Sequence, residues 1–229
     1  MKVLVLGGTG LVGRALVRRL AERGHEVAFT WCSDEAGAGA LPGRALRVDL
    51  SERGAASALF QSLDIEHFNI EGFAHCARLR PEQHQDADEA ELLERTVRLS
   101  AEAALLGARA LAEGSPDGVR NAVLCCAWSP GQSLPMAAPL AAAQGALVTL
   151  AMSLGRELAS QGVRVNGLAL GLLEGGAAEA VSPEQTETYT RLSALRRVGT
   201  AAEVAATIAW LLEENRIMNG RVLASNGGI

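Results

Sequence analysis

The sequence predicts an α/β fold: one domain built on a doubly wound parallel sheet of about seven strands, with helices on both faces. Short apolar runs of strand length alternate with helical stretches from one end of the chain to the other, without internal repeats or a linker. The first apolar run breaks into a cluster of glycines directly before a helix. The chain has 229 residues, of which 48% are hydrophobic, which suits one well-filled core and is short for two. We therefore expect a single domain over residues 1–229.

The elements follow one another in a regular order. The expected strands, each a short run rich in apolar residues, are residues 3–6, 26–31, 44–50, 68–76, 121–127, 163–170 and 220–225. The expected helices are residues 14–22, 53–63, 86–113, 140–161 and 201–213. Ser51 and Glu52 fit a cap for the second of these helices. Residues 171–199 hold glycines and a proline among polar residues, so we expect a flap or lid there with some helix.

The glycine cluster between the first strand and the first helix predicts a dinucleotide site. Gly8, Gly10 and Gly13 fit the spacing G-x-G-x-x-G, and Gly7 with the last two fits G-x-x-G-x-x-G. Such a turn lacks Cβ atoms where a pyrophosphate must approach the backbone, and it aims the positive end of the following helix at that anion. This context makes the predicted fold Rossmann-like. The expected cofactor loop consists of Gly7, Gly8, Thr9, Gly10, Leu11, Val12 and Gly13. The alternative is a glycine turn that only packs the helix on the strand.

The end of the second strand bears on which dinucleotide binds. In many NAD-binding folds this strand ends on an acid that accepts hydrogen bonds from the ribose 2′-hydroxyl. Here residues 30–33 are Thr-Trp-Cys-Ser, and the first acid, Asp34, comes late. This favours NADP(H) over NAD(H) if a dinucleotide is bound. Arg14 is a candidate partner for the 2′-phosphate, and a solvated helix residue is the alternative.

Composition and charge argue against several kinds of partner. A net charge of -5 and a pI near 5.5, without any basic run, give no footprint for nucleic acid. The first strand begins within three residues of Met1 and no uninterrupted apolar run reaches membrane length, so we expect no leader, no membrane partner and a cytoplasmic protein. No C-x-x-C spacing occurs, which predicts buried free thiols and no metal site. The four cysteines are Cys32, Cys76, Cys125 and Cys126.

Three motifs in the carboxyl-terminal half add a family resemblance. Residues 163–171 look like a strand R-V-N-x-x-x-P-G, with Leu170 in place of the proline. Residues 197–205 look like R-x-G-x-x-x-E-V-A, and residues 219–228 look like T-G-x-x-x-x-x-x-G-G. Over essentially its whole length the chain resembles the short-chain dehydrogenase/reductase family, and most of all the 3-oxoacyl-[acyl-carrier-protein] reductase type of ketoreductase.

The resemblance extends the expected cofactor site beyond the glycine loop. Asp49, followed by Leu50, matches the aspartate that hydrogen-bonds the adenine in this family, and a surface acid capping the next turn is the alternative. Ala74 and His75 stand where the family has its N-N-A-G segment, and Gly171 ends the R-V-N-x-x-x-P-G motif. The resemblance thus implies that these positions line the dinucleotide.

The same resemblance locates a catalytic set in which every residue type has changed. Family members transfer hydride from the nicotinamide to a carbonyl, using a Tyr, a Lys four residues later, a Ser and an Asn. Residues 144–147, Gln-Gly-Ala-Leu, look like the family's K-A-A-L, so Leu140 stands at the Tyr position and Gln144 at the Lys position. Arg98 stands at the Asn position. One anchor puts Trp128 at the Ser position and another puts Ala127 there.

Some group other than the family tyrosine could supply the proton. His75 has a pKa range suited to proton transfer, although a lone His is more often structural. Arg98 cannot give up its proton, and a salt bridge or a solvated helix face explains it better. The other groups expected near the strand ends are Cys76, Cys125, Cys126, Ser129 and Glu174. We keep His75 and Ser129 as the possible substitutes.

Together these features predict a ketoreductase-like protein without the usual catalytic residues. We expect a non-catalytic or regulatory subunit that pairs with an active NADPH-dependent ketoreductase, or forms a homo-oligomer, through the helices at 86–113 and 140–161. The second of these helices has an unusually small face that lets another helix approach closely: Ala141, Ala142, Gly145 and Ala146. The alternative is an atypical NADPH-dependent ketoreductase, or a non-redox cyclase or dehydratase, that acts on a polyketide or acyl substrate with substrate-assisted protonation.

Overall fold

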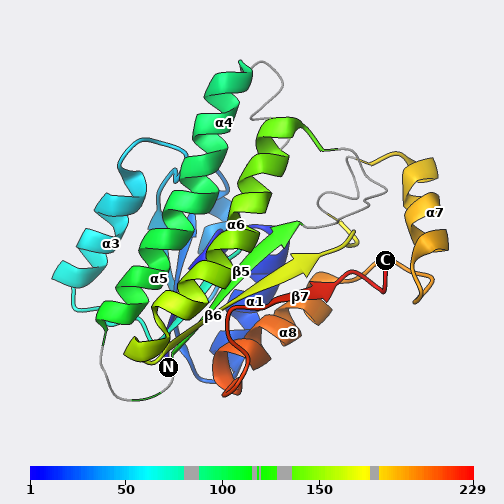
Figure 1. The fold of residues 1–229 in the computed structure, drawn as a ribbon. Coiled ribbons are helices and arrows are strands. Elements are labelled where there is room, and N and C mark those ends of the chain that lie inside the picture. Colours follow the sequence, from blue (N-terminus) through cyan, green and yellow to red (C-terminus); the bar gives the residue numbers. More distant parts are fainter. Residues whose placement is uncertain (80–87, 115–117, 119, 128–135, 176–180) are drawn as a thin grey trace.

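The structure is a computed structural model that describes residues 1–79, 88–114, 118, 120–127, 136–175 and 181–229. Its centre is a seven-stranded parallel sheet in the order β3-β2-β1-β4-β5-β6-β7 (Figure 1). The strands are β1 (Lys2–Leu6), β2 (Glu26–Trp31), β3 (Arg44–Arg47), β4 (Gly72–His75), β5 (Arg120–Ala127), β6 (Val163–Leu170) and β7 (Val222–Ser225). The strand order reverses between β1 and β4, where sheets of this kind open a ligand crevice at their carboxyl edge. The predicted fold class is confirmed.

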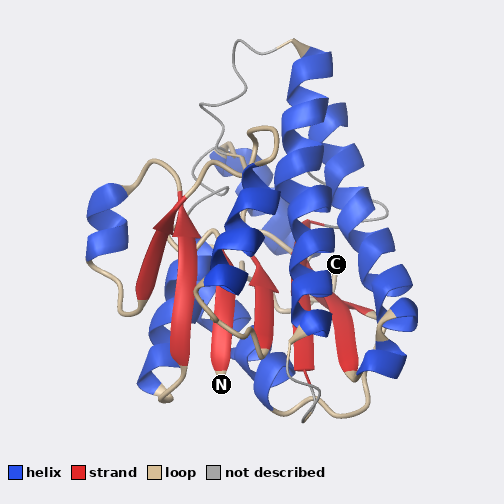
Figure 2. Cartoon of the chain, turned by 90° about the vertical axis from the view of Figure 1, so that its left-hand side faces the viewer, coloured by secondary structure: helices blue, strands red, loops and turns tan. Residues whose placement is uncertain are grey.

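Helices cover both faces of the sheet (Figure 2). They are α1 (Leu11–Glu22), α2 (Glu35–Gly39), α3 (Ala55–Ile65), α4 (Glu89–Val97), α5 (Ala103–Glu113), α6 (Ala138–Glu157), α7 (Pro183–Leu192) and α8 (Ala201–Glu213). One core lies between the sheet and α3, α5 and α6, and it takes Leu4 and Leu6 of β1. The other core lies on the side of α1 and α8, and it takes Val3 and Val5. Burial on both faces explains why β1 and β2 are almost continuous apolar runs.

Several elements have other bounds than expected, such as β4, which was expected at 68–76, and three further features differ from the sequence-based expectations. The long helix expected at 86–113 is divided, because Arg98–Glu102 forms a turn of π-helix between α4 and α5. Ser51 does not cap α3. It donates instead to Asp49 Oδ1 at 2.7 Å, and the cap position of α3 is Gly54, whose φ of 78° suits a glycine. The segment after β2 contains an unexpected short helix, α2, because Asp34 accepts a hydrogen bond from the backbone N–H of Gly37.

Helix α6 is the most apolar long element among the described residues. By length and composition alone this helix could cross a membrane. Within this chain, 33% of its most apolar window is buried. Its inner face packs on the sheet through Ala143, Leu147, Ala151 and Leu154. Its outer face exposes small residues, including Ala141, Ala142 and Gly145. The small face predicted from the sequence therefore points away from the core.

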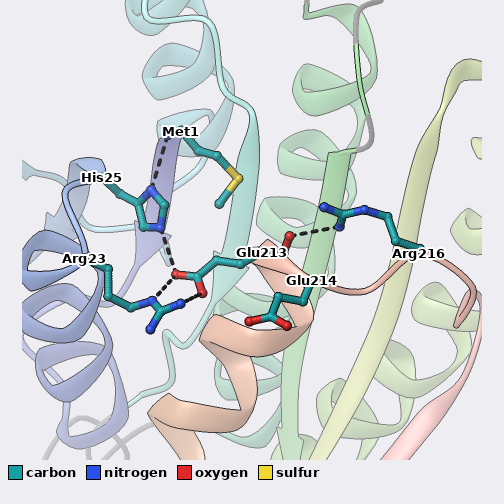
Figure 3. Close-up of a pocket in the computed structure, with 6 residues that line it drawn as sticks. All are labelled: Met1, Arg23, His25, Glu213, Glu214 and Arg216. Atoms are coloured by element: carbon teal, nitrogen blue, oxygen red, sulfur yellow. Dashed lines mark hydrogen bonds and ion pairs between the residues drawn. The ribbon is translucent and has the colours of Figure 1, made fainter.

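A charged network joins the amino-terminal edge of the sheet to the end of α8 (Figure 3). Glu213 accepts hydrogen bonds from Arg23 Nε and from His25 Nε2, each at 2.8 Å, and the Met1 amino group lies 3.3 Å from His25 Nδ1. Burial alone would raise the pKa of the Glu213 carboxyl, but the hydrogen bonds from Arg23 and His25 outweigh burial and hold that pKa below its ordinary value. The hollow that these residues line is at the opposite edge of the sheet from the glycine loop.

We expect Glu213→Gln to destabilise the fold at neutral pH. The variant keeps the shape of the side chain but removes the charge that Arg23 and His25 contact, which costs about 1–2 kcal/mol of unfolding free energy. Because the folded-state pKa of Glu213 is lowered, the wild-type chain loses this contribution as the pH falls below about 4.3 and through the folded pKa. Thermal unfolding across this pH range should therefore show the two proteins converging in acid. An equal loss in Glu214→Gln, an exposed neighbour in the same hollow, would contradict this account.

Candidate functional site at the carboxyl edge of the sheet

The glycine loop joins β1 to α1 and rests on two neighbouring strands. The backbone N–H of Gly7 donates to Thr30 Oγ1 at 2.9 Å, and that of Gly8 donates to the Thr30 carbonyl at 2.8 Å. Gly7 has a φ of 79°, and a Cβ there would lie 2.6 Å from Ala77 Cα, after β4. A Cβ at Gly13 would collide with the Gly7 carbonyl. Packing alone therefore requires Gly7 and Gly13.

Gly10 is the glycine that packing explains least. It is exposed and occupies the cap position of α1, where a Cβ would meet only the Gly7 carbonyl, at 3.2 Å. No side chain caps this end of α1, and no acid lies in its first turn. The first N–H groups of a helix need partners and carry partial positive charge, so they can bind an anion. The loop thus fits a phosphate group that approaches over Gly10.

The residues proposed for the ribose and adenine end make contacts within the chain. Arg14 Nη2 lies 3.0 Å from both Asp34 Oδ2 and the Thr9 carbonyl, so Arg14 is ion-paired rather than simply solvated. Asp49 Oδ1 accepts from both the backbone N–H and the hydroxyl of Ser51. Asp49 therefore stabilises the turn after β3, as the alternative interpretation of this residue requires. Arg14 and Asp34 still lie beside the glycine loop, at the end of β2.

The end of β4 places His75 in a fully buried position. Its Nε2 lies 2.8 Å from the Leu99 carbonyl in the π-helical turn. A carbonyl can only accept, so Nε2 carries the proton, and Nδ1 is an acceptor without a partner among the described residues. Burial lowers the pKa of this imidazole, which keeps it neutral. In this arrangement His75 can accept a hydrogen bond at Nδ1. Its single N–H, at Nε2, already donates to the Leu99 carbonyl.

The structure brings two of the altered catalytic positions to the end of β5. Gln144 Oε1, from α6, accepts a hydrogen bond from the backbone N–H of Ala127 at 2.7 Å. Leu140 is one helical turn earlier, so it lies on the same face of α6. Ala127, one of the two residues considered for the serine position, is therefore a direct neighbour of Gln144. Trp128 and Ser129 lie outside the described residues.

Arg98 is held by structural contacts. Its Nη1 donates to the Ser51 carbonyl at 3.2 Å, and its Nη2 forms an ion pair with Glu94 one turn earlier on the helix. This bears out the salt bridge considered for Arg98. Arg98 thus connects the π-helical turn to the loop after β3, and its positive charge is paired with Glu94.

The chain contains one tyrosine and one lysine, and neither stands on α6. Tyr189, on α7, is buried, and its hydroxyl donates to the Asn226 carbonyl beyond β7 at 2.9 Å. Burial raises the pKa of this phenol. A Cβ on Gly171 would collide with the Tyr189 hydroxyl, so packing accounts for this glycine. Lys2 opens β1 at the opposite edge of the sheet, where its Nζ lies over the ring of Phe68.

The lid segment after β6 reaches back to the glycine loop. Leu173 pairs with Gly199, and the backbone N–H of Glu174 donates to the Gly199 carbonyl at 2.9 Å. A Cβ on Gly175 would lie 3.4 Å from Leu11 Cδ1, so this part of the lid packs on the start of α1. Helix α7 follows within the same segment (Figure 1). The first residues of the expected flap thus contact the start of α1.

Two thiols that the sequence pattern did not pair lie close together. Cys76 Sγ and Cys125 Sγ lie 3.7 Å apart, and both residues are only partly buried. Cys126 is buried and directs its Sγ toward the Leu168 carbonyl instead. The available signal was that Cys76 and Cys125 each lie near the carboxyl end of a strand, on strands that neighbour each other in this sheet.

Comparisons with known proteins agree with this fold. A family model described as enoyl-(acyl carrier protein) reductase matches residues 10–229. The 3-oxoacyl-[acyl-carrier-protein] reductase FabG of Vibrio cholerae is 29% identical, with 99% of this chain and 96% of the relative covered. Among solved structures, the promiscuous reductase LugOII, which catalyses keto-reduction at C1 during lugdunomycin biosynthesis, is 28% identical with a TM-score of 0.81, covering 99% and 96%. A blue fluorescent protein from a metagenomic library, solved with NADPH, shares the fold at 22% identity and a TM-score of 0.85, covering 99% and 96%.

Proposed function

Since the chain belongs to the short-chain dehydrogenase/reductase family, with 3-oxoacyl-[acyl-carrier-protein] reductases among its relatives, we propose that it is a ketoreductase-like subunit without turnover of its own. In this proposal it holds NADP(H) at the glycine loop. It pairs with an active NADPH-dependent ketoreductase, and its role is regulatory or structural.

The contact between Gln144 and Ala127 carries the proposal. At the position where the family has lysine, an amide oxygen accepts the N–H of the last residue of β5. An amide has no positive charge to lower the pKa of a phenol, and Leu140 has no proton to give. A ketone that receives hydride becomes an alkoxide, which needs a donor already in place. Neither Leu140 nor Gln144 provides one.

The glycine loop fits the dinucleotide that the proposal requires. The exposed Gly10 and the uncapped start of α1 would hold the pyrophosphate. In the adjoining segment Nδ1 of buried His75 is an acceptor that has no partner within the described part of the chain. NADP(H) is favoured over NAD(H) because β2 ends without an acid and because Arg14 lies beside the glycine loop. Arg14 already forms an ion pair with Asp34. When bound to an active member of the family, NADPH supplies hydride to a carbonyl, and in this proposal no such transfer takes place on this chain. This chain's own residues bind and orient the dinucleotide.

We expect Gly10→Trp to abolish the stabilisation of the chain by NADPH. A large side chain at this exposed cap would fill the space over the helix terminus, while the core packing of Gly7 and Gly13 stays intact. A saturating ligand at 100 times its Kd stabilises a protein by about 2.7 kcal/mol, which a thermal-shift assay resolves. Ala58→Trp, an exposed position on α3, is the matched control and should keep the NADPH shift. If the wild-type chain shows no shift with either dinucleotide, the loop is only structural.

The proposed contact with another subunit is on α6. An apolar 20-residue helix that is mostly unburied in the chain, with Gly145 open to solvent on its outer face, is suited to packing against another helix. On α4, beside α6, Leu93 and Val97 are 40% and 38% exposed and lie one turn apart. The same surface would serve a homo-oligomer or a pair with a related reductase.

Co-expression with an active ketoreductase encoded in the same genome tests the pairing. We expect the two chains to purify together and native mass spectrometry to detect a hetero-oligomer. Pairing is contradicted if the chains never co-purify and the reductase is fully active alone.

A second candidate function is an atypical NADPH-dependent ketoreductase, or a non-redox cyclase or dehydratase, on a polyketide or acyl substrate that supplies its own proton donor. It is favoured by the likeness to LugOII and by a hollow of about 550 Å³ beside the lid. The apolar part of that lining suits an acyl or aromatic group and includes Leu172, Leu173, Leu195, Val198 and Val204. Oxidation of NADPH by the chain alone, over a panel of hydroxylated ketones, separates the redox form of this function from the first.

A further inference from the structure

We propose that Cys76 and Cys125 are a modification site, forming a reversible disulfide within the chain when a peroxide oxidises the protein. Both cysteines follow buried stretches of neighbouring parallel strands, one step beyond the ladder pair His75 and Leu124. Their sulfur atoms are already 3.7 Å apart. The proposal concerns the thiols alone and does not depend on turnover or on a partner.

The backbone geometry suits a bridge between these two residues. Neighbouring strands of a sheet lie about 4.8 Å apart, and a disulfide accepts Cα separations of about 4.4–6.8 Å. Both side chains lie on the sheet face that carries α1 and α8, so they point to the same side. The sulfur atoms must close from 3.7 Å to about 2.05 Å, which side-chain rotation can provide.

The neighbouring cysteine is not an equivalent partner. Cys126 faces the opposite core, is 1% exposed and directs its Sγ to the Leu168 carbonyl. Cys76 and Cys125, in contrast, are only partly buried, and the proposal requires the oxidant to reach Cys76 alone. The alternation of side chains along β5 therefore selects Cys125 and not Cys126.

The chemistry divides into an attack and a resolving step. The hydrogen bond with Cys76, together with burial, raises the pKa of the Cys125 thiol, so Cys125 keeps its proton. Cys76 then attacks the peroxide: its sulfur takes one oxygen to become a sulfenic acid, and the other oxygen leaves as water or alcohol. Cys125 sulfur next attacks the sulfenic sulfur, the S–S bond forms, and the hydroxyl leaves with the Cys125 proton as water. Two thiols are oxidised by two electrons and one peroxide is reduced.

The place of this bridge connects it to the glycine loop. The peptide that follows Cys76 packs on Gly7, whose Cβ would lie 3.0 Å from the Cys76 carbonyl carbon. The backbone of residues 76 and 77 thus packs directly against Gly7, the first glycine of the loop. A bridge at Cys76 would be formed next to the segment that positions this loop.

Peptide mapping of the full chain tests the proposal. Trypsin separates Cys76, in residues 54–78, from Cys125 and Cys126, in residues 121–156, and from Cys32, in residues 24–44. After hydrogen peroxide treatment and alkylation, we expect peptides 54–78 and 121–156 to be linked with the loss of two hydrogens, and a thiol reductant to separate them. Free alkylated Cys76 in the oxidised wild-type protein would overturn the proposal.

Two variants identify the partner of Cys76. Cys126→Ser should retain the link. Cys125→Ser should lose it and leave a Cys76 sulfenic acid that dimedone traps. A link that persists in Cys125→Ser, or one that joins Cys32 at the same rate, would also overturn the assignment. Since the wild-type mapping is itself decisive, a variant that fails to fold leaves the test intact.

Discussion

The combined variant Leu140→Tyr, Gln144→Lys and Ala127→Ser will reduce ketones with NADPH at rates well above those of the wild-type chain. A positioned general acid contributes about 10²–10⁴-fold to such a step, so a gain of at least about 100-fold is expected. Leu140 and Gln144 lie on one face of α6, and Gln144 already reaches the end of β5 at Ala127. The scaffold therefore presents the three restored groups to the same region.

We expect the triple variant to have a lower free energy of unfolding than the wild-type chain, which can be measured separately from its rate. A lysine at position 144 cannot accept the N–H of Ala127 as the amide oxygen does, and an N–H left without a partner costs about 1–3 kcal/mol. Thermal unfolding of the variant measures this loss. Rates should be compared only under conditions where each protein is folded.

A control that lacks only the acid makes the gain specific. Leu140→Phe combined with the other two substitutions keeps the ring, the lysine and the serine but has no phenol hydroxyl. We expect this control to stay near the wild-type rate. If the control is as fast as the tyrosine variant, or the wild-type chain is as fast as both, the interpretation of Leu140 and Gln144 is wrong.

The second large effect is expected from Ala142→Arg on the outer face of α6. Ala142 is exposed, and it lies on the apolar face that we propose as the contact with another subunit. An arginine there would place an unpaired charge between closely packed helices, which is costly when the contact excludes water. We expect the dissociation constant of the oligomer to rise at least about 100-fold, or about 2.8 kcal/mol.

Sedimentation measures this change, and a matched substitution controls for it. Ala58→Arg also replaces an exposed helical alanine, on α3, and should leave the assembly unchanged. Gly145→Ala is informative in addition, because its Cβ would meet nothing within 4 Å in the single chain. It should stabilise the monomer by up to about 1 kcal/mol. A wild-type chain that is monomeric at all concentrations and pairs with no reductase would contradict the proposed surface.

The regular elements were predictable because they depend on local pattern. β2, β6 and α8 have the bounds that the sequence suggested, since each is a continuous apolar or helical stretch with clear ends. The π-helical turn at Arg98–Glu102 was not predictable, because helical spacing continues through it. The prediction that Ser51 caps α3 was wrong, because the Ser51 backbone N–H and hydroxyl both donate hydrogen bonds to Asp49 and not to the helix.

The long-range contacts made by the candidate site residues could not be predicted from the sequence. The sequence analysis considered a salt bridge for Arg98 without a partner, and helical spacing could have identified Glu94, four residues earlier. The Ser51 carbonyl that Arg98 also binds is 47 residues away. The same holds for Gln144 with Ala127 and for Cys76 with Cys125, which only the sheet brings together. Long-range contacts of this kind follow from the topology, which a single sequence specifies only in outline.

Single-turnover oxidation of NADPH by the wild-type chain alone tests the central claim most directly. The chain, in excess over NADPH, is mixed with a panel of hydroxylated ketones in a stopped-flow instrument, after a thermal-shift assay has established that NADPH binds. We predict bound NADPH with no oxidation above a heat-treated control. Oxidation that exceeds this control and is lost in Gly10→Trp would show that the chain is an enzyme, and would contradict the account.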